Sequence, residues 1–370
     1  MSKLFERTEI NGMVLENRFV RSATWEGMAA EDGAVTGRLI AAMEDLARGG
    51  VGLIISSHSY VSPEGQAGPR QLGVYKDELI PRLREMTAAV HQNGGRIVMQ
   101  LSHAGKFAPE KLIGRPPLAV SDEGETGTAR YFEITDQDIP GIITAFADGA
   151  RRAKAAGFDG VQIHSAHGYL LSQFLSPVFN RRRDDYGGDV YNRARIHLDV
   201  YQAVRESVGK DYPVMIKLNC RDFVENGLSL DDSLAAGRML ADLGLDAIEL
   251  SGGLLTERKL SPSRPGIRPE ADEAYYRDES RSFKDAVDIP LILVGGVRSF
   301  QTAERLVEEG AADYISMSRP FIREPGLINR WKSGDRRKSG CNSDNRCFRA
   351  GMTESGIYCE TIRIENEQQQ

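Results

Sequence analysis

The chain has 370 residues, of which 41% are hydrophobic and 27% are charged, and this composition is enough to bury a large core. Its net charge of −6, with acids and bases interspersed, argues against nucleic acid or an anionic membrane as the main partner. The first residues lack the apolar run of a signal peptide, and no stretch of about eighteen apolar residues occurs. We therefore expect a cytoplasmic protein.

The chain begins with a predicted β-hairpin and then alternates strands with helices. Residues 1–17 read as a hairpin around Asn11-Gly12 that closes the bottom of the fold or packs beside it. Helical spacing follows in the stretches around 39–46 and 142–150, and Ser299 and Gly310 are placed to begin and end another helix. The eight predicted strands cover 18–24, 51–58, 96–103, 160–167, 213–219, 247–253, 290–296 and 313–320.

Eight apolar strands alternating with helices predict an α/β fold, the (β/α)₈ or TIM barrel. Residues 104–138 and 254–284 are long insertions after strands three and six, and they are candidates for substrate lids. Residues 331–370 form a polar C-terminal extension, in which 365–370 are expected to fray. We expect residues 1–370 to form a single domain.

Polar residues stand at the ends of the predicted strands, where a barrel gathers them into one mouth. Gly295 and Gly296 after strand seven allow close approach of backbone N–H groups, and Arg319 after strand eight adds a forked cation. This combination predicts a phosphorylated ligand. The alternative is that the glycines only form a tight turn and that Arg319 pairs with a surface acid.

Lys217 stands in an apolar strand, where a lysine costs free energy unless it meets an anion. Three interpretations stay open. It could form a Schiff base in a barrel lyase, it could be a fixed charge beside an electron-accepting ring, or its ammonium could extend to water.

The stretch 162-QIHSAHGY-169 holds two histidines and a tyrosine at the end of strand four. A zinc site needs a third protein ligand, and no HExxH motif accompanies His164 and His167. The two N–H donors could instead stabilise an enolate oxygen, with Tyr169 protonating the adjacent carbon. Packing of satisfied histidines is the remaining alternative.

Together these stretches resemble the Old Yellow Enzyme family of NAD(P)H:flavin oxidoreductases and ene-reductases. The resemblance is carried by 14-VLENRFVRSA-23, 94-GGRIVMQLSHAGK-106, 164–195, 294-VGGVRS-299 and 318-SRPFIREP-325, and 164–195 is the most specific part. It implies a barrel that binds flavin mononucleotide (FMN) in its mouth. It also implies homo-oligomers, although no interface can be identified from the sequence.

The resemblance assigns roles residue by residue. His164 and His167 would bind the carbonyl oxygen of the substrate, and Tyr169 would be the proton donor. Gln100 would hydrogen-bond the pyrimidine part of the flavin, and Lys217 would lie near its N1 atom. The implied FMN-binding residues are Ser22, Ala23, Thr24, His58, Gln100, Lys217, Gly295, Gly296, Ser318 and Arg319.

The implied reaction is a ping-pong scheme in one site. NADH or NADPH reduces the flavin and leaves, and the flavin then delivers hydride to the β-carbon of an α,β-unsaturated carbonyl compound. Expected partners are therefore an activated alkene and a nicotinamide nucleotide. The alternatives are an NADH oxidase or dehydrogenase with a C-terminal iron–sulfur site, and the Schiff-base lyase.

Two features depart from the family pattern. Trp25 stands where relatives commonly have threonine or cysteine near flavin O4. The stretch 341-CNSDNRCF-348 with Cys359 resembles the C-x-x-C-N-x-C motif of larger iron–sulfur relatives, but Asp344 replaces the second cysteine. We therefore expect Cys341, Cys347 and Cys359 to be reduced thiols, and no metal site. The alternative is an aspartate-ligated or three-iron cluster held by these cysteines.

Overall fold

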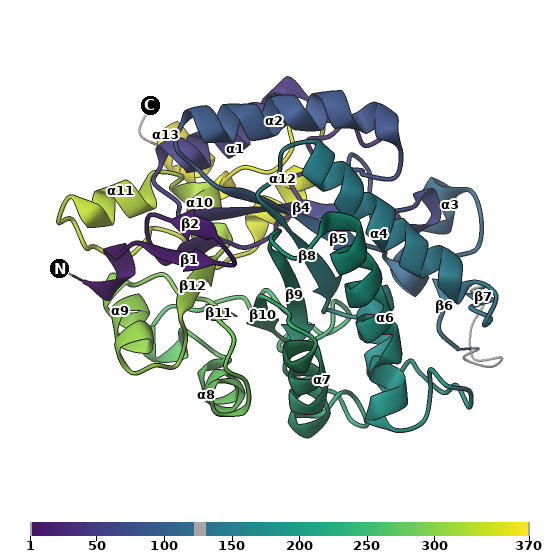
Figure 1. The fold of residues 1–370 in the computed structure, drawn as a ribbon. Coiled ribbons are helices and arrows are strands. Elements are labelled where there is room, and N and C mark those ends of the chain that lie inside the picture. Colours follow the sequence, from purple (N-terminus) through teal and green to yellow (C-terminus); the bar gives the residue numbers. More distant parts are fainter. Residues whose placement is uncertain (1, 122–130, 369–370) are drawn as a thin grey trace.

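The computed structural model of the protein describes residues 2–121 and 131–368, and its centre is a closed barrel (Figure 1). Its strands pair in parallel in chain order, and the last closes onto the first. Each predicted strand overlaps one of them, so the (β/α)₈ barrel is confirmed. The strands are β3 (Phe19–Arg21), β4 (Leu53–Tyr60), β5 (Ile97–Ser102), β8 (Gly160–Ser165), β9 (Val214–Asn219), β10 (Ala247–Ser251), β11 (Leu291–Val294) and β12 (Tyr314–Met317).

Amphipathic helices cover the outside of the barrel, because their apolar stripes pack on the outward side chains of the strands. Leu39, Met43 and Leu46 form such a stripe on α1, and the hydroxyl of Thr36 caps its first turn. The long helices are α1 (Gly37–Arg48), α2 (Ile80–Gln92), α4 (Ile139–Ala155), α6 (Val190–Val208), α7 (Leu230–Asp242), α8 (Arg277–Ala286) and α9 (Phe300–Glu308). Short helices are α3 (Glu110–Ile113), α5 (Leu170–Leu175), α10 (Arg319–Arg323) and α11 (Leu327–Lys332).

The N-terminal hairpin consists of β1 (Thr8–Ile10) and β2 (Met13–Leu15), which pair antiparallel. Asn11 and Gly12 have φ angles of 43° and 77°, the left-handed pair that a type I′ turn requires. The apolar hairpin side chains cluster with residues at the starts of the barrel strands, such as Leu53 and Ala247. The hairpin therefore closes the N-terminal end of the barrel, and the opposite end is left for a ligand.

Helix α9 begins after Ser299 and ends before Gly310, as the sequence predicts. The hydroxyl of Ser299, however, does not cap the helix. It donates to Glu273 Oε1 at 2.8 Å, and the backbone N–H groups of Arg298 and Ser299 donate to the other oxygen of the same carboxylate. The Glu273 carboxylate thus fixes the chain just before the helix, and the Ser299 side chain leaves the first turn uncapped.

The two insertions follow β5 and β10. The first contains α3 and a two-stranded sheet of β6 (Leu118–Ala119) and β7 (Phe132–Glu133), and the part at 122–130 lies outside the described residues. The second extends less far than predicted, because residues 277–286 are the barrel helix α8, with Ser280 and Phe283 buried against the barrel. Residues 252–276 are the actual loop.

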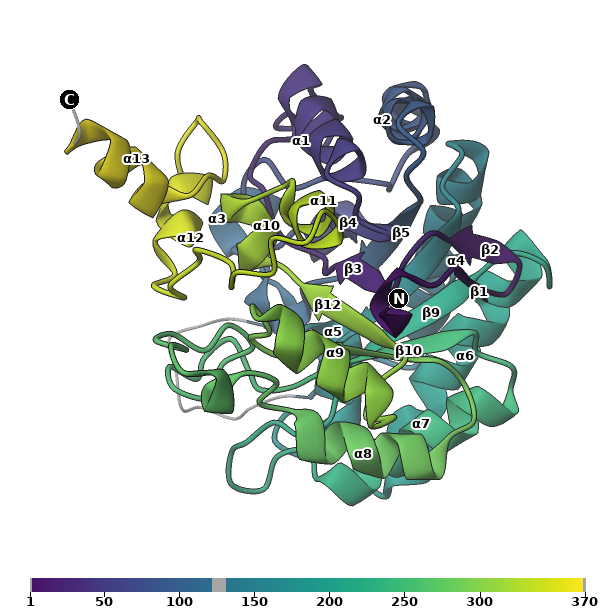
Figure 2. The ribbon, with the colours of Figure 1, turned by 90° about the vertical axis from the view of Figure 1, so that its left-hand side faces the viewer.

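The C-terminal extension packs against the loop between β3 and α1. It carries α12 (Arg346–Gly351) and α13 (Glu360–Glu367), which lie to one side of the barrel (Figure 2). The Ile357 N–H donates to Glu26 O at 2.7 Å, and Arg70 donates to two carbonyls of the extension. The expected fraying is wrong for residues 365–367, which end α13. Among the described residues, no helix is long and apolar enough to cross a membrane.

Candidate active site

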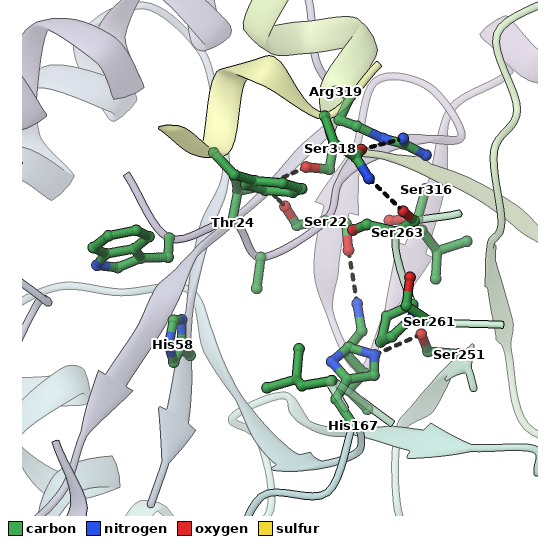
Figure 3. Close-up of a pocket in the computed structure, with 18 of the residues that line it drawn as sticks. Ser22, Thr24, His58, His167, Ser251, Ser261, Ser263, Ser316, Ser318 and Arg319 are labelled. Carbon is green, nitrogen blue, oxygen red and sulfur yellow. Dashed lines mark hydrogen bonds between the residues drawn. The ribbon is translucent and has the colours of Figure 1, made fainter. Parts of the chain in front are cut away.

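A cavity of about 680 Å³ opens at the C-terminal ends of the barrel strands (Figure 3). Every predicted site residue except Gly295 lines it, and Gly295 is the neighbour of lining residue Gly296. The predicted residues that meet there are Ser22, Ala23, Thr24, His58, Gln100, His164, His167, Tyr169, Lys217, Gly296, Ser318 and Arg319. Strand ends far apart in the sequence thus form one site, as a barrel requires.

His164, His167 and Tyr169 form a cluster because the chain turns sharply after β8. His167 has a φ of 65° and Gly168 one of 86°, a left-handed pair that reverses the chain before α5. The strained conformation of His167 is held by its N–H, which donates to Asn219 Oδ1 at 3.1 Å. The ring of His164 lies 5.2 Å from that of His167 and 5.0 Å from that of Tyr169, between centroids.

Both histidines are neutral. Burial lowers the pKa of His164 and His167 well below the usual value, and the neighbouring Lys217 adds to the shift in each case. His167 Nε2 lies 2.8 Å from Ser251 Oγ (Figure 3), whereas His164 Nδ1 is buried without a hydrogen-bond partner in the described structure. A neutral imidazole can offer one N–H donor to a ligand without adding charge.

Tyr169 keeps its proton, because burial raises the pKa of its phenol above 10. Its hydroxyl lies 3.3 Å from Nε2 of His58, and the two rings stack with centroids 5.5 Å apart. Burial also lowers the pKa of His58 to about 4, so this neighbour is neutral as well. The predicted place of His58 near the end of a strand is confirmed, whereas the sequence does not predict its contact with Tyr169.

Buried neutral histidines also make stability depend on pH. Burial lowers the pKa of His197 to about 4, although backbone contacts oppose the shift, and its Nε2 lies 2.7 Å from Ser165 Oγ. The unfolded chain binds a proton below about pH 6.5 that the folded chain excludes, so stability falls as pH drops from 6.5 toward 4.

We expect His197→Gln to remove about 1 kcal/mol per pH unit from the slope of unfolding free energy between pH 6 and 5. Urea unfolding at several pH values measures this slope. An unchanged slope in His197→Gln would show that His197 is protonated in the folded state.

A buried polar network lies under the cavity floor. The Lys217 ammonium contacts Glu249 Oε1 at 3.0 Å and donates to Ser22 Oγ at 2.7 Å. Ser22 and Ser316 donate to the same carboxylate oxygen at 2.7 and 2.8 Å. Gln162 Nε2 donates to the second oxygen at 2.9 Å, and Gln100 Nε2 donates to Gln162 Oε1 at 2.6 Å.

Glu249 and Gln162 are absent from the residues that the sequence predicts. The sequence does contain a signal for Glu249. It is a charged residue within the apolar strand 247-AIELS-251, as Lys217 is within its own apolar strand, and the structure pairs the two residues across adjacent strands. Burial disfavours the charged carboxylate, but Lys217 and the serine hydroxyls hold the pKa of Glu249 below its usual value. Lys217 is thus part of an ion pair, and this geometry does not favour a Schiff-base nucleophile.

The ends of β11 and β12 form the predicted anion-binding side of the cavity. Gly296 has a φ of 78°, and a Cβ there would lie 2.7 Å from Tyr275 Cε1. Thr24 Oγ1 and Ser318 Oγ are 2.7 Å apart (Figure 3). Arg319 donates to Asn345 Oδ1 at 2.6 Å and to Arg264 O at 3.0 Å, and it pairs with no acid in the described part of the chain. The alternative of a surface ion pair for Arg319 is therefore wrong.

Arg298 is a second arginine that lines the cavity, and the sequence did not single it out. It is 1% exposed, and its Nη1 donates to Cys341 O at 2.8 Å. Its Nε and Nη2 atoms have no partner within residues 2–121 and 131–368. Trp25 also lines the cavity, and its Nε1 is likewise buried and unpartnered. Buried N–H groups nearly always have a hydrogen-bond acceptor in folded proteins, so these groups are candidates to donate to a bound ligand.

Cys341, Cys347 and Cys359 meet beside α10, where they line a space of about 10 Å³, barely enough for one water molecule. Burial raises the pKa of Cys347 to about 11, so this thiol is protonated. Asp344 accepts a hydrogen bond from Thr361 at 2.7 Å. Within the described ranges no group of three or more His, Cys, Asp or Glu side chains could hold a metal ion.

Comparison with known proteins identifies the family to which the chain belongs. Residues 3–338 match the model of the NADH:flavin oxidoreductase / NADH oxidase family. An NADH oxidase from Thermoanaerobacter brockii is 37% identical over 337 residues, which are 90% of this chain and 51% of that protein. The chain thus spans about half the length of that relative. An NADPH dehydrogenase from a Geobacillus strain is 34% identical over 323 residues, 87% of this chain and 91% of that protein.

A solved structure agrees with these sequence relatives. The Old Yellow Enzyme homologue from Zymomonas mobilis superposes with a TM-score of 0.77 at 28% identity, over 92% of this chain and 96% of that one. The barrel, the cavity at its C-terminal end and the sequence match all point the same way. The chain therefore belongs to the NADH:flavin oxidoreductase / NADH oxidase family, the FMN-dependent family of Old Yellow Enzyme.

Proposed function

We propose that this FMN-dependent oxidoreductase is an ene-reductase, which uses NADH or NADPH to reduce the C=C bond of α,β-unsaturated carbonyl compounds. One observation carries the proposal. Two neutral imidazoles, of His164 and His167, and the protonated phenol of Tyr169 line a single cavity, and the ring centroid of His164 lies 5.2 Å from that of His167 and 5.0 Å from that of Tyr169. This arrangement supplies donors for a carbonyl oxygen and an acid for the neighbouring carbon.

The donor set of the cavity suits FMN. Gly296 lines the cavity with no Cβ, which would lie 2.7 Å from Tyr275 Cε1, and Arg319 lines the same cavity as a cation without an acidic partner among the described residues. The unpartnered Nε and Nη2 atoms of Arg298 add two donors on the same side. These residues would hold the phosphate. Ser22, Ala23, Thr24, His58, Gln100 and Lys217 would hold the flavin ring, with Gly295 and Ser318 shaping the phosphate end.

When bound, FMN supplies hydride transfer between the nicotinamide nucleotide and the substrate. The chain's own residues do the rest. His164 and His167 bind the substrate carbonyl oxygen and orient the alkene. Tyr169 gives its proton to the α-carbon, and its raised pKa means that it still carries that proton at neutral pH. His58, at 3.3 Å, holds the phenol hydroxyl in place between turnovers.

The proposal is tested by the absorption spectrum of the purified protein under anaerobic conditions. We expect a yellow protein that is bleached by NADH or NADPH and regains its colour when an enone is added. A yellow protein that NAD(P)H bleaches but that only oxygen reoxidises would instead be an NADH oxidase, the function named for the relative from Thermoanaerobacter brockii. A protein that takes up no FMN would contradict both functions.

Loss of one histidine should weaken binding of oxyanions. We expect His164→Phe and His167→Phe each to raise the dissociation constant of a substituted phenol by about tenfold to a hundredfold, since phenylalanine cannot donate and a hydrogen bond to a charged group contributes roughly 1.5–3 kcal/mol. Titration of the flavin spectrum with the phenol measures this constant. His103→Phe is a matched control, since His103 is also buried but does not line the cavity. Unchanged phenol affinity would contradict the assignment of the oxyanion site.

A further inference from the structure

Glu249 is the centre of the network beneath the cavity, yet it does not line the cavity itself. Its side chain is fully buried, and four groups converge on its two oxygens: the Lys217 ammonium, the Ser22 and Ser316 hydroxyls, and the Gln162 amide. Lys217, Ser22 and Ser316 line the cavity, as does Gln100 at the far end of the network. Glu249 therefore reaches a ligand only through these neighbours.

The charge on Glu249 determines how the amides of the network point. An ionised carboxylate can only accept hydrogen bonds, so Gln162 must turn its Nε2 toward Glu249. The Oε1 of Gln162 then faces Gln100, which must donate its own Nε2. The Oε1 of Gln100 and its second N–H then remain available to hydrogen-bond a ligand. Such an edge complements a cis amide or imide, which offers one N–H beside one C=O.

The same charge offsets the cation in the cavity wall. Lys217 Nζ lies 3.0 Å from Glu249 Oε1, and their side chains are 4% and 0% exposed. Water screens such a pair little, so the two charges act on the cavity as a nearly neutral unit. A ligand that gains negative charge is stabilised less by this unit than by a lone ammonium.

We propose that Glu249 is a positioning residue for the flavin. Through Gln162 it turns the Oε1 edge of Gln100 toward the cavity, and its charge offsets Lys217, so that the bound flavin is harder to reduce than it would be beside an isolated cation. This inference rests on the proposed place of the flavin over Gln100 and Lys217.

Glu249→Gln tests both parts, because it keeps the shape of the side chain and removes its charge. Lys217 then acts as an unpaired cation, and the flavin should become easier to reduce. We expect the reduction equilibrium to shift about tenfold toward reduced flavin, which is about 30 mV for a two-electron couple. Anaerobic titration of the FMN-bound protein against a reference dye measures this shift.

The effect of Glu249 on the orientation of the Gln162 and Gln100 amides is tested separately, by flavin binding. An amide at position 249 can donate as well as accept, so the side-chain amides of Gln162 and Gln100 are free to flip. FMN and riboflavin should therefore both bind Glu249→Gln about tenfold more weakly, which corresponds to the loss of roughly one hydrogen bond. Gln162→Met is the matched variant, since it interrupts the chain of amides and leaves the charge of Glu249 in place. It should weaken both flavins similarly and leave the reduction equilibrium within about twofold of wild type.

The double variant Lys217→Met/Glu249→Gln keeps the test decisive if Glu249→Gln does not fold, because it leaves no uncompensated buried charge. If Lys217 and Glu249 act as a neutral unit, the reduction equilibrium of the flavin in the double variant stays within about threefold of wild type. A shift of tenfold or more toward oxidised flavin would mean that Lys217 acts as a lone cation, and it would overturn the proposal. So would an unchanged equilibrium in Glu249→Gln. Failure of wild-type protein to bind FMN would instead overturn the proposed flavin site.

Discussion

Tyr169→Phe is expected to slow reduction of an enone by at least about a hundredfold, because general acid catalysis of this kind contributes about 10² to 10⁴. Reduction of the flavin by NADPH should change less than about twofold, since Tyr169 donates no proton in that half-reaction. Single-turnover stopped-flow measurements, made separately for the two half-reactions, give both rates.

His58→Gln is the informative companion to Tyr169→Phe. Gln can still hydrogen-bond the phenol hydroxyl, which lies 3.3 Å from His58 Nε2, so the enone rate should fall much less than in Tyr169→Phe. The enone rate of wild type should not decline as pH rises to 10, because burial raises the pKa of Tyr169 above that value. Equal effects of Tyr169→Phe on both half-reactions would remove Tyr169 from the role of proton donor.

Arg319→Met is expected to weaken FMN binding by about tenfold to a hundredfold, because a hydrogen bond to a charged group contributes roughly 1.5–3 kcal/mol. Riboflavin, which has no phosphate, should bind wild type and variant equally well. Fluorescence titration of the apoprotein with each flavin gives the two dissociation constants.

Arg323→Met is the control for this substitution. Arg323 belongs to the same short helix but pairs with Glu365 and does not line the cavity. Its replacement should leave both flavin affinities unchanged. Equal weakening of FMN and riboflavin by Arg319→Met would mean that Arg319 only supports the cavity wall. In that case Arg298, with its unpartnered Nε and Nη2, would be the remaining candidate for the phosphate.

The fold was readable from local patterns. Each barrel strand is a short apolar run, and each long helix has a stripe of buried side chains, because both elements bury a periodic set of residues that the sequence itself displays. Asn11-Gly12 identified the hairpin turn, since few other pairs adopt two left-handed conformations. Boundaries set by tertiary packing were less accurate. Helix α8, for example, lies partly inside the stretch 254–284 that was predicted as a loop.

Most of the site was also predictable, because the carboxyl ends of parallel strands must meet at one end of a barrel. That rule and the family resemblance brought Ser22, His164, Lys217 and Arg319 into one group. Neither could tell which buried polar residues contact one another across strands. Gln100, Gln162, Lys217 and Glu249 become one network only through the register of four strands.

The sequence by itself determined the barrel, the end that carries the site and the residue types that face the cavity, because periodicity and strand polarity are local properties of the chain. Only the tertiary structure decided that Lys217 is paired with Glu249, that His58 contacts Tyr169, and that Arg298 keeps two unpartnered donors. The physical reason is that such contacts depend on how the strands are staggered around the closed barrel. A one-residue change in that stagger would alter every cross-strand contact and leave each local pattern the same.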